Sequence, residues 1–338
     1  MTATSGARQG TPRVRIVIVN YNGGADLRRS VAAALAQDFA DFELVVIDNG
    51  STDGSLDGLP ADPRLAVRRM GENLGFAAAN NRAASDAAGE FLATLNPDAF
   101  PEPGWLAALM RAVSRHPGTA MFGSTQISDR DPSRLDGTGD AYFALGQPWR
   151  GGYGRPAGEL PGEGETFSPC AAAALWALEA FRAAGGFDER FFCYCEDVDL
   201  GFRLRLAGAT CIQVSDAVVR HVGASGAGKA SDFARYHSAR NRIWLFAKDM
   251  PGPLLWPLAP GFAALNLALL GWAVARGDGA VTGRGMRDAI CGIGPVLAER
   301  GRVQAARRVS ARRIAGALSW SPLRMLARRH DVRAMHIS

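Results

Sequence analysis

Short apolar runs alternate with segments of helical spacing along much of the chain. Residues 14–19 and 42–47 are apolar runs that predict buried strands, and residues 26–37 between them have helical periodicity. The alternation continues, with further strands predicted at residues 65–68, 90–95, 120–127, 210–214 and 218–223 and further helices at residues 73–88, 105–116, 178–184 and 236–248. Strand–helix–strand units with short connections are right-handed and parallel. The pattern therefore predicts an α/β fold with a mostly parallel sheet flanked by helices.

Polar side chains follow two of these strands directly. Asp48 ends one strand and precedes a loop of small polar residues, while residues 96–98, Asn-Pro-Asp, follow another. Ligands of parallel sheets gather at the carboxyl ends of the strands. Asp48 there can accept hydrogen bonds from a ribose or a base, and Asp98 can hold a divalent cation that neutralises a diphosphate. By spacing alone, binding is the favoured interpretation for Asp48, and a turn is the favoured one for Asp98.

An acidic stretch at residues 185–204 carries five carboxylates within twelve residues, among aromatic side chains and at a predicted loop that enters a helix. Aromatic surroundings partly dehydrate a carboxylate and raise its pKa, which suits a general base. The alternative is that Glu196, Asp197 and Asp199 only complement the positive N-terminus of the helix. The stretch alone leaves both interpretations open.

Two other features of this region are less specific. Residues 129–165 are rich in Gly and Pro without clear periodicity, and a long irregular connection inside a domain is usually functional or mobile. His221 follows a predicted strand, and a lone histidine at such a place is more often structural than a metal ligand.

The C-terminal part has a different character. Residues 251–275 carry no charge and are long enough to span a bilayer. Pro253, Pro257 and Pro260 favour a re-entrant or interfacial element over either a clean span or a buried hairpin. Residues 303–329 place apolar side chains among many arginines, a composition typical of an amphipathic helix on an anionic membrane. Nucleic-acid binding is the weaker alternative, because no aromatic platform or recognition motif accompanies the arginines.

Composition limits the class of protein. With 338 residues and 47% hydrophobic content, the chain can bury one large core, or one core plus an appendage. The net charge of +5 arises mainly from ten arginines between Arg300 and the C-terminus, against one acid, Asp331. The five cysteines show no disulfide framework and predict reduced thiols in the cytosol. Residues 1–13 are polar and Gly-rich, which predicts a disordered start without a secretory signal.

Six segments of the chain resemble, in order, the motifs of family 2 glycosyltransferases, in the branch that includes bacterial rhamnosyltransferases. They are residues 18–22, 47–55, 73–80, 95–98, the acidic stretch with its Glu196-Asp197 pair, and His221 with Arg240 and Asn241. Together they cover residues 14–245. The resemblance implies the GT-A fold, a Rossmann-like, mostly parallel sheet flanked by helices, to which the chain adds a helical, membrane-associating C-terminal extension.

The resemblance also implies a role for each matching side chain. The nucleotide-sugar donor would be bound by Asn20, Asn22, Asp48, Asn73 and Asn96. Asp98 and His221 would hold a divalent metal, Mg²⁺ or Mn²⁺. Asp197 would be the catalytic base that deprotonates an acceptor hydroxyl for inverting attack on the anomeric carbon, and Glu196 would bind the acceptor. The metal would stabilise the departing diphosphate.

Two of the departures from the family pattern bear on the chemistry. The D-x-D element of the family reads Asn96-Pro97-Asp98, with a single acid. The Q-x-x-R-W element of processive polysaccharide synthases is absent, and residues 237–241 stand near its place. Transfer of single sugars is therefore expected rather than polymerisation.

The sequence leads to one hypothesis about function. Residues 14–250 would form an inverting glycosyltransferase domain that moves rhamnose or another hexose from a nucleoside-diphosphate sugar to a saccharide or polyprenyl-linked acceptor in cell-surface polysaccharide synthesis. Residues 251–338 would attach it peripherally to the inner face of the cell membrane, in the cytoplasm. No nucleic acid is expected as a partner, and a homo-oligomer is left open. The alternative is a non-catalytic nucleotide-sugar-binding protein that keeps the fold.

Overall fold

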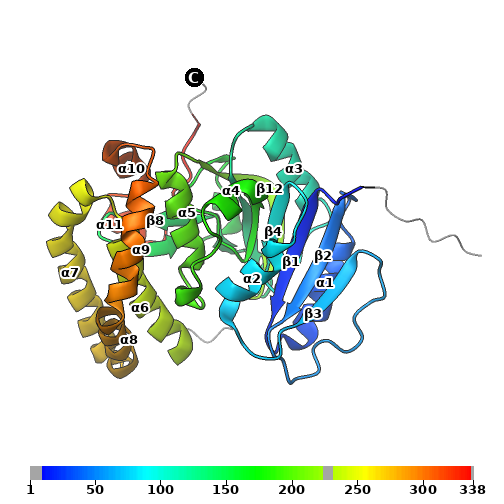
Figure 1. The fold of residues 1–338 in the computed structure, drawn as a ribbon, viewed down its shortest axis with the longest axis horizontal. Helices are drawn as coiled ribbons and strands as arrows, with labels where there is room; N and C mark the ends of the chain where they lie inside the picture. The colour runs from blue at the N-terminus through cyan, green and yellow to red at the C-terminus, as the bar shows by residue number, and fades with distance from the viewer. Residues whose placement is uncertain (1–9, 224–230, 336–338) are drawn as a thin grey trace, which may run out of the picture.

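The computed structural model describes residues 10–223 and 231–335. Most of the predicted disordered start, residues 1–13, therefore lies outside the described residues. The described chain forms a mostly parallel sheet with helices on both faces and a layer of helices at one end (Figure 1). The predicted α/β class is confirmed.

The sheet is parallel apart from one central strand and short edge pairings. Its main strands are β1 (Val14–Asn20), β2 (Phe42–Asp48), β3 (Leu65–Arg69), β4 (Phe91–Leu95), β6 (Met121–Ser128), β11 (Ala173–Ala177) and β12 (Cys211–His221). They lie in the order β12-β6-β11-β4-β1-β2-β3, and only β11 runs antiparallel to its neighbours among them. Because β1, β2 and β4 run in the same direction, their carboxyl ends meet at one edge of the sheet.

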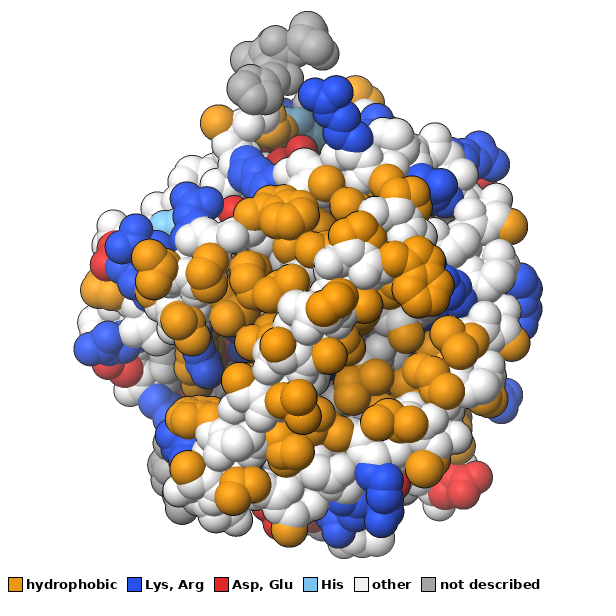
Figure 2. Space-filling model, turned by 90° about the vertical axis from the view of Figure 1, so that its left-hand side faces the viewer, with side chains coloured by type: hydrophobic (Ala, Val, Ile, Leu, Met, Phe, Trp, Pro, Cys, Tyr) orange, Lys and Arg blue, Asp and Glu red, His pale blue; other side chains and the backbone are white. Residues whose placement is uncertain are grey.

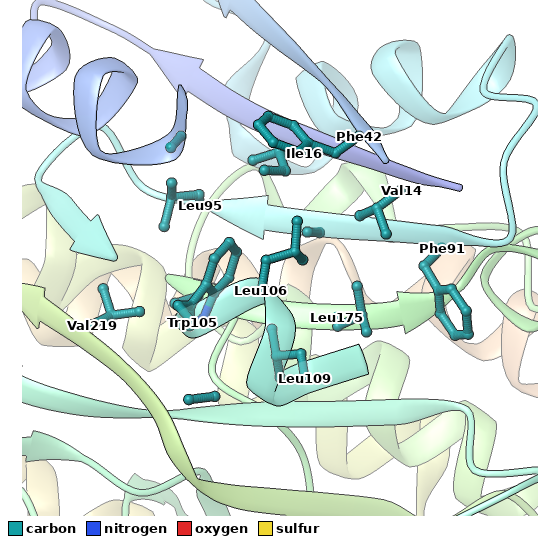
Figure 3. Close-up of a cluster of buried hydrophobic side chains, with 14 of the residues drawn as sticks. Val14, Ile16, Phe42, Phe91, Leu95, Trp105, Leu106, Leu109, Leu175 and Val219 are labelled. Atoms are coloured by element: carbon teal, nitrogen blue, oxygen red, sulfur yellow. The ribbon is translucent and has the colours of Figure 1, made fainter. Parts of the chain in front are cut away.

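Successive side chains of β1 point to opposite faces of the sheet, and each face has its own buried cluster. The covering helices are α1 (Gly24–Leu35) and α3 (Trp105–Arg115) on one face, and α2 (Gly75–Ser85), α4 (Leu178–Ala183) and α5 (Glu196–Leu206) on the other. Ile16 belongs to the first cluster and Val17 to the second. Figure 3 shows the first cluster, in which Trp105 and Leu106 of α3 lie over the sheet.

The Gly- and Pro-rich connection at residues 129–165 contains short strands. They are β7 (Leu135–Gly137), β8 (Asp140–Tyr142), β9 (Pro148–Arg150) and β10 (Gly164–Glu165), with a 3-10 turn, η1 (Ala157–Glu159). β8 and β9 form an antiparallel hairpin, while β7 and β10 pair with β6 and β12. Strands of two or three residues are too short to show a periodicity, so the sequence pattern did not reveal them.

The strands predicted at residues 210–214 and 218–223 are one strand, β12. Its pairing with β6 shifts register between Val214 and Val218. The prediction of two strands was wrong, because a bulge with polar residues interrupts the apolar pattern without ending the strand. The last residues of β12 also pair with β5 (Ala99–Pro101).

The chain ends in a layer of helices at the left of Figure 1. They are α6 (Asp232–Asp249), α7 (Gly252–Ala275), α8 (Gly279–Cys291), α9 (Ile293–Ala305), α10 (Ala311–Ala317) and α11 (Pro322–Leu326). The single amphipathic helix suggested for residues 303–329 is not present: the side chains of Ser310 and Ser321 cap new helices, and Ile314 is buried. One buried cluster joins this layer to Tyr142 and Phe202, so a common core crosses residue 250.

α7 is a single helix that includes Pro257 and Pro260. It is the one helix of the described residues whose length and apolar composition would suffice to cross a membrane, and most of that stretch is not buried in the protein. Trp256 and Leu267 are 75% and 67% exposed, and Trp272 is 60% exposed. Figure 2 shows this side of the molecule: hydrophobic side chains cover its centre, and Lys and Arg side chains lie around its edge.

Candidate active site

The loops after β1, β2 and β4 contribute to a cavity of about 470 Å³ at the carboxyl edge of the sheet. Its polar lining includes Asn22, Asn49, Asn73, Asn96 and Asp98. Aromatic side chains also line it, namely Tyr21, Phe76, Phe192, Tyr194 and Phe233. Apolar walls with a few convergent polar groups are typical of small-molecule sites. Four of the predicted site residues, all except Asn49 in the polar list, therefore meet here.

Asn20 and Asp48 are buried and are not part of this lining. The Asn20 amide donates to Ser51 Oγ at 2.9 Å and to Ser55 Oγ at 2.8 Å, and its oxygen accepts from the Gly23 N–H at 3.2 Å. Asp48 Oδ1 accepts from the Ser51 N–H at 3.2 Å. In this structure, the two side chains predicted to bind the nucleotide hold together the loops that line the cavity.

Asn49 and Asn73 support each other at the cavity wall. Asn49 Nδ2 donates to Asn73 Oδ1 at 2.8 Å, and Asn49 Oδ1 accepts from the Leu74 N–H at 2.9 Å. Asn22 has a left-handed backbone, φ 54°, and its Oδ1 accepts from the Thr52 N–H at 2.8 Å. Asn adopts this conformation more readily than other non-glycine residues because its short polar side chain can hydrogen-bond locally.

His221 lies beside Asp98 because β12 pairs with β5, which places His221 opposite Ala99. His221 Nε2 is 3.2 Å from Asp98 Oδ1, and Nδ1 is 2.7 Å from Asp136 Oδ2. A carboxylate at one ring nitrogen of a histidine fixes the tautomer and leaves the other nitrogen as a ligand. The donor set therefore fits a divalent cation held by Asp98 and His221, with Asp136 orienting the imidazole.

The charges of this group agree with that arrangement. Burial lowers the pKa of His221, but its hydrogen bonds to Asp136 and Asp98 outweigh burial and raise the pKa above its ordinary value. Burial likewise opposes ionisation of Asp98, yet its contact with His221 lowers the pKa of that carboxyl. The carboxylates therefore attract positive charge to the imidazole, and a metal ion would take the place of its proton.

A second close group consists of Asp140, Cys170 and Asp197, whose ligand atoms lie within 4.8 Å of one another. Burial raises the pKa of the Cys170 thiol to about 12, and the Arg150 guanidinium favours the ionised form of all three groups. A thiol is a poor ligand for Mg²⁺ or Mn²⁺. The chemistry of the two groups favours Asp98 and His221 for a hard cation.

Glu196 and Asp197 line a second cavity of about 270 Å³, together with Asp140, Trp149 and Arg150. The two cavities have four lining residues in common: Phe76, Asn96, Cys193 and Tyr194. They are therefore neighbours, separated only by this shared wall.

Backbone donors hold the Asp197 carboxylate in a fixed position at the start of α5. Its Oδ2 accepts from the Ala171 N–H at 3.0 Å and its Oδ1 from the Val198 N–H at 2.8 Å. Burial raises the pKa of Asp197, against the effect of these donors and of Arg150. Burial and the nearby Asp197 raise the pKa of Glu196 well above its ordinary value, and Glu196 Oε2 has no hydrogen-bond partner among the described residues.

Of the remaining carboxylates of the acidic stretch, Glu189 is exposed, and Asp188 and Asp199 are engaged in buried ion pairs. Asp188 caps η2 (Glu189–Phe191), and its Oδ2 lies 2.6 Å from Lys248 Nζ. Asp199 pairs with Arg203 one turn along α5, at 2.7 Å, and also with Lys248. These buried pairs tie α5 to α6, so among these carboxylates only Glu196 and Asp197 line the second cavity.

The loop before α5 has an unusual backbone. Phe192, Tyr194 and Cys195 have φ values of 65°, 70° and 67°. The Cys193 N–H donates to the Phe191 carbonyl at 2.7 Å, which closes a γ-turn around Phe192. Such conformations persist only where the surrounding structure enforces them, and they concentrate at functional sites.

Asn241 of α6 holds this loop. Its fully buried amide donates to the carbonyls of Phe191 at 2.9 Å, Cys193 at 2.9 Å and Tyr194 at 2.7 Å. Arg240 adds a hydrogen bond to the Phe191 carbonyl at 2.9 Å. The Arg-Asn pair that the sequence singled out therefore acts on the backbone that leads to Asp197.

Sequence reasoning assigned no role to four residues of this site: Asn49, Asp140 and Arg150, which line the cavities, and Asp136, which contacts His221. Asn49 directly follows Asp48 within a motif that was recognised, so its position was available as a signal. The other three lie in the irregular connection at residues 129–165. Its length was the only sign of function, because nothing in its pattern showed which side chains a hairpin would place together.

The class of protein follows from comparison with known proteins. The family model for glycosyl transferase family 2 matches residues 15–174. The N-acetylglucosaminyl-diphospho-decaprenol L-rhamnosyltransferase of Mycobacterium tuberculosis is 32% identical over 295 residues, covering 73% of this chain and 90% of the relative. The O-antigen biosynthesis protein RfbC of Myxococcus xanthus is 32% identical over 256 residues, covering 72% of this chain and 20% of that protein. The chain belongs to glycosyltransferase family 2, in its rhamnosyltransferase-like branch.

Solved structures show the same fold. The mannosyltransferase PcManGT from Pyrobaculum calidifontis, in complex with GDP-Man and Mn²⁺, superimposes with a TM-score of 0.54 at 20% identity, covering 88% of this chain and 86% of that one. GalNAc-T7 with UDP, GalNAc and Mn²⁺ gives a TM-score of 0.57 at 15% identity, over 71% of this chain and 48% of that one. The fold is therefore GT-A, as the resemblance implied, and the protein is a glycosyltransferase that uses nucleotide sugars.

Proposed function

We propose that the protein transfers a single sugar, rhamnose or another hexose, from a nucleoside-diphosphate sugar to a saccharide or lipid-linked acceptor, with inversion at the anomeric carbon. The observation that carries this proposal is the pair of neighbouring cavities, one rich in amides and aromatic rings and the other containing the held carboxylate of Asp197. The first has the character of a nucleotide-sugar site, and the second offers a base to an acceptor hydroxyl.

The donor would occupy the first cavity. Asn22, Asn49 and Asn73 offer hydrogen-bonding groups to the nucleoside, and aromatic side chains offer faces for its base. Asp98 and His221 would hold Mg²⁺ or Mn²⁺, which supplies positive charge against the diphosphate as it leaves. Two of the solved GT-A neighbours contain Mn²⁺, which supports this class of cofactor for the present chain.

Asp197 would act as the base. Two backbone N–H groups keep its carboxylate in one orientation, and its raised pKa makes it a stronger proton acceptor than an exposed aspartate. It takes the proton of an acceptor hydroxyl, whose oxygen bonds to the anomeric carbon as the bond to the diphosphate breaks. One displacement of this kind inverts the configuration of that carbon.

The wall of the second cavity packs, through the β8–β9 hairpin, against the exposed apolar helix α7. The hairpin β8–β9 carries Asp140 and Arg150, and its turn packs on α7: a side chain at Gly146 would collide with Phe262. Phe262 in turn stacks on Phe246 of α6, with ring centroids 4.0 Å apart. An acceptor site supported by an apolar exposed helix suits an acceptor whose sugar is attached to a membrane lipid.

We therefore extend the proposal to the membrane. The exposed face of α7 would lie in the interfacial region of the inner leaflet, on the cytoplasmic side, with the surrounding arginines at anionic headgroups. On this proposal, the exposed side chains of residues 251–338 contact the membrane, while their buried side chains share a core with residues 14–250. Peripheral attachment, rather than a span, is supported by the packing of α7 along α8 and the β8–β9 hairpin.

The name of the Mycobacterium tuberculosis relative specifies a polyprenyl-diphosphate-linked N-acetylglucosamine acceptor. We adopt this acceptor class for the present chain, with a role in cell-surface polysaccharide synthesis. The competing function is a non-catalytic nucleotide-sugar-binding protein. The held carboxylate of Asp197 argues against it, since a base is not needed for binding alone.

The experiment is a transfer assay with the purified full-length chain. UDP-, GDP- and dTDP-linked hexoses are offered with a polyprenyl-diphosphate-linked N-acetylglucosamine in vesicles, with Mn²⁺, with Mg²⁺ or with EDTA. NMR of the product reports the anomeric configuration. One donor should yield product of inverted configuration that depends on the cation. Donor binding without product or hydrolysis for every donor would favour the non-catalytic alternative.

A further inference from the structure

Asp140 presents a free carboxylate to the second cavity. Only 7% of the residue is exposed, and it lines that cavity. Its main chain is fixed on both sides, since its N–H donates to the Ser168 carbonyl at 2.8 Å and its carbonyl accepts from the Ser168 N–H and from Thr166 Oγ1, each at 3.2 Å. Within residues 10–223 and 231–335, no hydrogen bond or ion pair reaches its side chain. Its oxygens are not among the fully buried unpartnered side-chain atoms of the described residues, so they face the open space of the cavity and are available to a ligand.

The neighbours of Asp140 narrow the kind of ligand. A carboxylate oxygen of Asp140 lies within 4.8 Å of one from Asp197. Arg150 is directly opposite Asp140 in the hairpin, and its guanidinium is bonded to Asp136 Oδ2 at 2.5 Å. Arg150 is the one Lys or Arg in the lining of the second cavity among the described residues, and Asp136 already pairs with it, so a diphosphate would find no free positive charge beside Asp140. The ligand groups that suit Asp140 are therefore neutral hydrogen-bond donors, such as the hydroxyls of a sugar.

We infer that Asp140 binds a hydroxyl of the acceptor sugar that neighbours the hydroxyl deprotonated by Asp197. Asp140 thereby selects among acceptors and sets which hydroxyl faces the base. The inference rests on the proposed transfer reaction and adds to it the recognition of the acceptor. The lipid diphosphate of the acceptor then lies outside this part of the cavity, because Arg150 is already paired with Asp136.

The packing of Arg150 supports a fixed geometry for this site. Its aliphatic part lies against Gly137, where an added Cβ would approach Arg150 Cδ to 2.6 Å. The guanidinium therefore contacts Asp136, the carboxylate that orients His221, and is also close enough to Asp197 in the acceptor cavity to favour its ionised form. Burial raises the pKa of Asp140 well above its ordinary value. A carboxyl group in this state can accept a hydroxyl hydrogen bond in either protonation state.

The test compares Asp140→Asn and Asp140→Ala with the wild-type chain. The probes are an alkyl N-acetylglucosaminide and its 3-, 4- and 6-monodeoxy forms. For the parent acceptor, Asp140→Ala should lower kcat/KM about 10- to 100-fold, because a hydrogen bond to a charged group is lost. Donor affinity, measured by calorimetry without acceptor, should be unchanged, because Asp140 does not line the first cavity. One deoxy acceptor, which lacks the hydroxyl that Asp140 binds, should lower kcat/KM of the wild-type chain by a similar factor. For Asp140→Ala, the same deoxy acceptor should give the same kcat/KM as the parent acceptor.

Two readouts keep this test independent of the proposed reaction. Saturation-transfer-difference NMR of the same acceptors, with the donor nucleotide present, measures binding without turnover and should show one ring position that loses contact in Asp140→Ala. Asp131→Asn is the matched control, because among the described residues the side chain of this exposed aspartate contacts only Ser133 and Arg134. A wild-type chain that binds acceptor but transfers no sugar would contradict the proposed reaction alone. Wild-type acceptor binding and kcat/KM in Asp140→Ala, or equal losses for every deoxy acceptor, would overturn the role of Asp140.

Discussion

Asn241 provides a quantitative test of how the loop before the base is held. The change Asn241→Ala removes three hydrogen bonds from one buried amide to the carbonyls of Phe191, Cys193 and Tyr194. A net contribution of about 1 kcal/mol per hydrogen bond, reduced because one NH₂ group serves three acceptors, gives a loss of about 2 kcal/mol. The left-handed residues of the loop each store of order 1 kcal/mol or more, so the freed loop is expected to relax.

Relaxation of the loop should reduce catalysis as well as stability. A shift of about 2 kcal/mol away from the present conformation reduces its population up to about 30-fold, at 1.4 kcal/mol per factor of ten. We expect kcat to fall by about 10- to 30-fold and the free energy of unfolding, measured in urea, to fall by about 2 kcal/mol. Steady-state transfer assays at saturating donor and acceptor measure the first quantity.

Gln304→Ala is the matched control for this change. Its amide also donates to main-chain carbonyls, those of Lys248 and Asp249, but at the C-terminal end of α6, away from the loop. It should lose a comparable amount of stability while kcat stays within about twofold of the wild-type value. Wild-type kcat in Asn241→Ala, or an equal loss of kcat in Gln304→Ala, would refute the claim that Asn241 acts through the loop.

Three further predictions concern pH, metal and membrane. The base must be ionised to act, and burial raises the pKa of Asp197, so activity should be lost as pH falls through that raised pKa. The acid limb of the pH profile of kcat/KM should therefore lie above 3.8, the ordinary pKa of an aspartate. An acid limb at or below 3.8 would contradict the burial of the base. Asp136→Asn should weaken Mn²⁺ binding about 10- to 100-fold in calorimetric titration, because His221 loses its orienting carboxylate, whereas unchanged affinity would place the metal elsewhere. Leu267→Glu combined with Trp272→Glu should reduce binding to anionic vesicles more than tenfold without loss of stability, because each side chain buried in the membrane contributes roughly 1.5 kcal/mol or more. Val67→Glu, at an exposed apolar position on β3, is the control. An equal loss of vesicle binding in Val67→Glu would argue against α7 as the membrane contact.

Much of the sheet could be predicted from the sequence. β1, β2 and β4 are mostly apolar runs, and the helices between them have clear periodicity, so period and length together identified them. β6 was also predicted, although its second half is mostly polar. β11 could not be recognised, since a short run of Ala and Leu is compatible with either kind of element. The hairpin β8–β9 was invisible for a related reason, because its strands of three residues are defined by pairing rather than by pattern.

The candidate site was predictable where a polar residue follows a strand. Asp98 illustrates this, since it lies at the cavity as its position after β4 implied. Asp140 and Arg150 were not predictable, because their position depends on the fold of residues 129–165 over the cavity. Asn20 shows a different limit: a sequence motif identifies a residue near a ligand, but only the structure shows that its amide is engaged with Ser51 and Ser55.

The central claim is that Asp197 is the base of an inverting sugar transfer. The most direct test is Asp197→Asn, which keeps the shape of the side chain and removes its capacity to take a proton. Transfer is measured with donor and acceptor at saturation, and donor affinity is measured by calorimetry on the same preparation. The account predicts a fall in kcat of at least about a hundredfold, with donor affinity within about twofold of the wild-type value. Transfer by Asp197→Asn at the wild-type rate would contradict it.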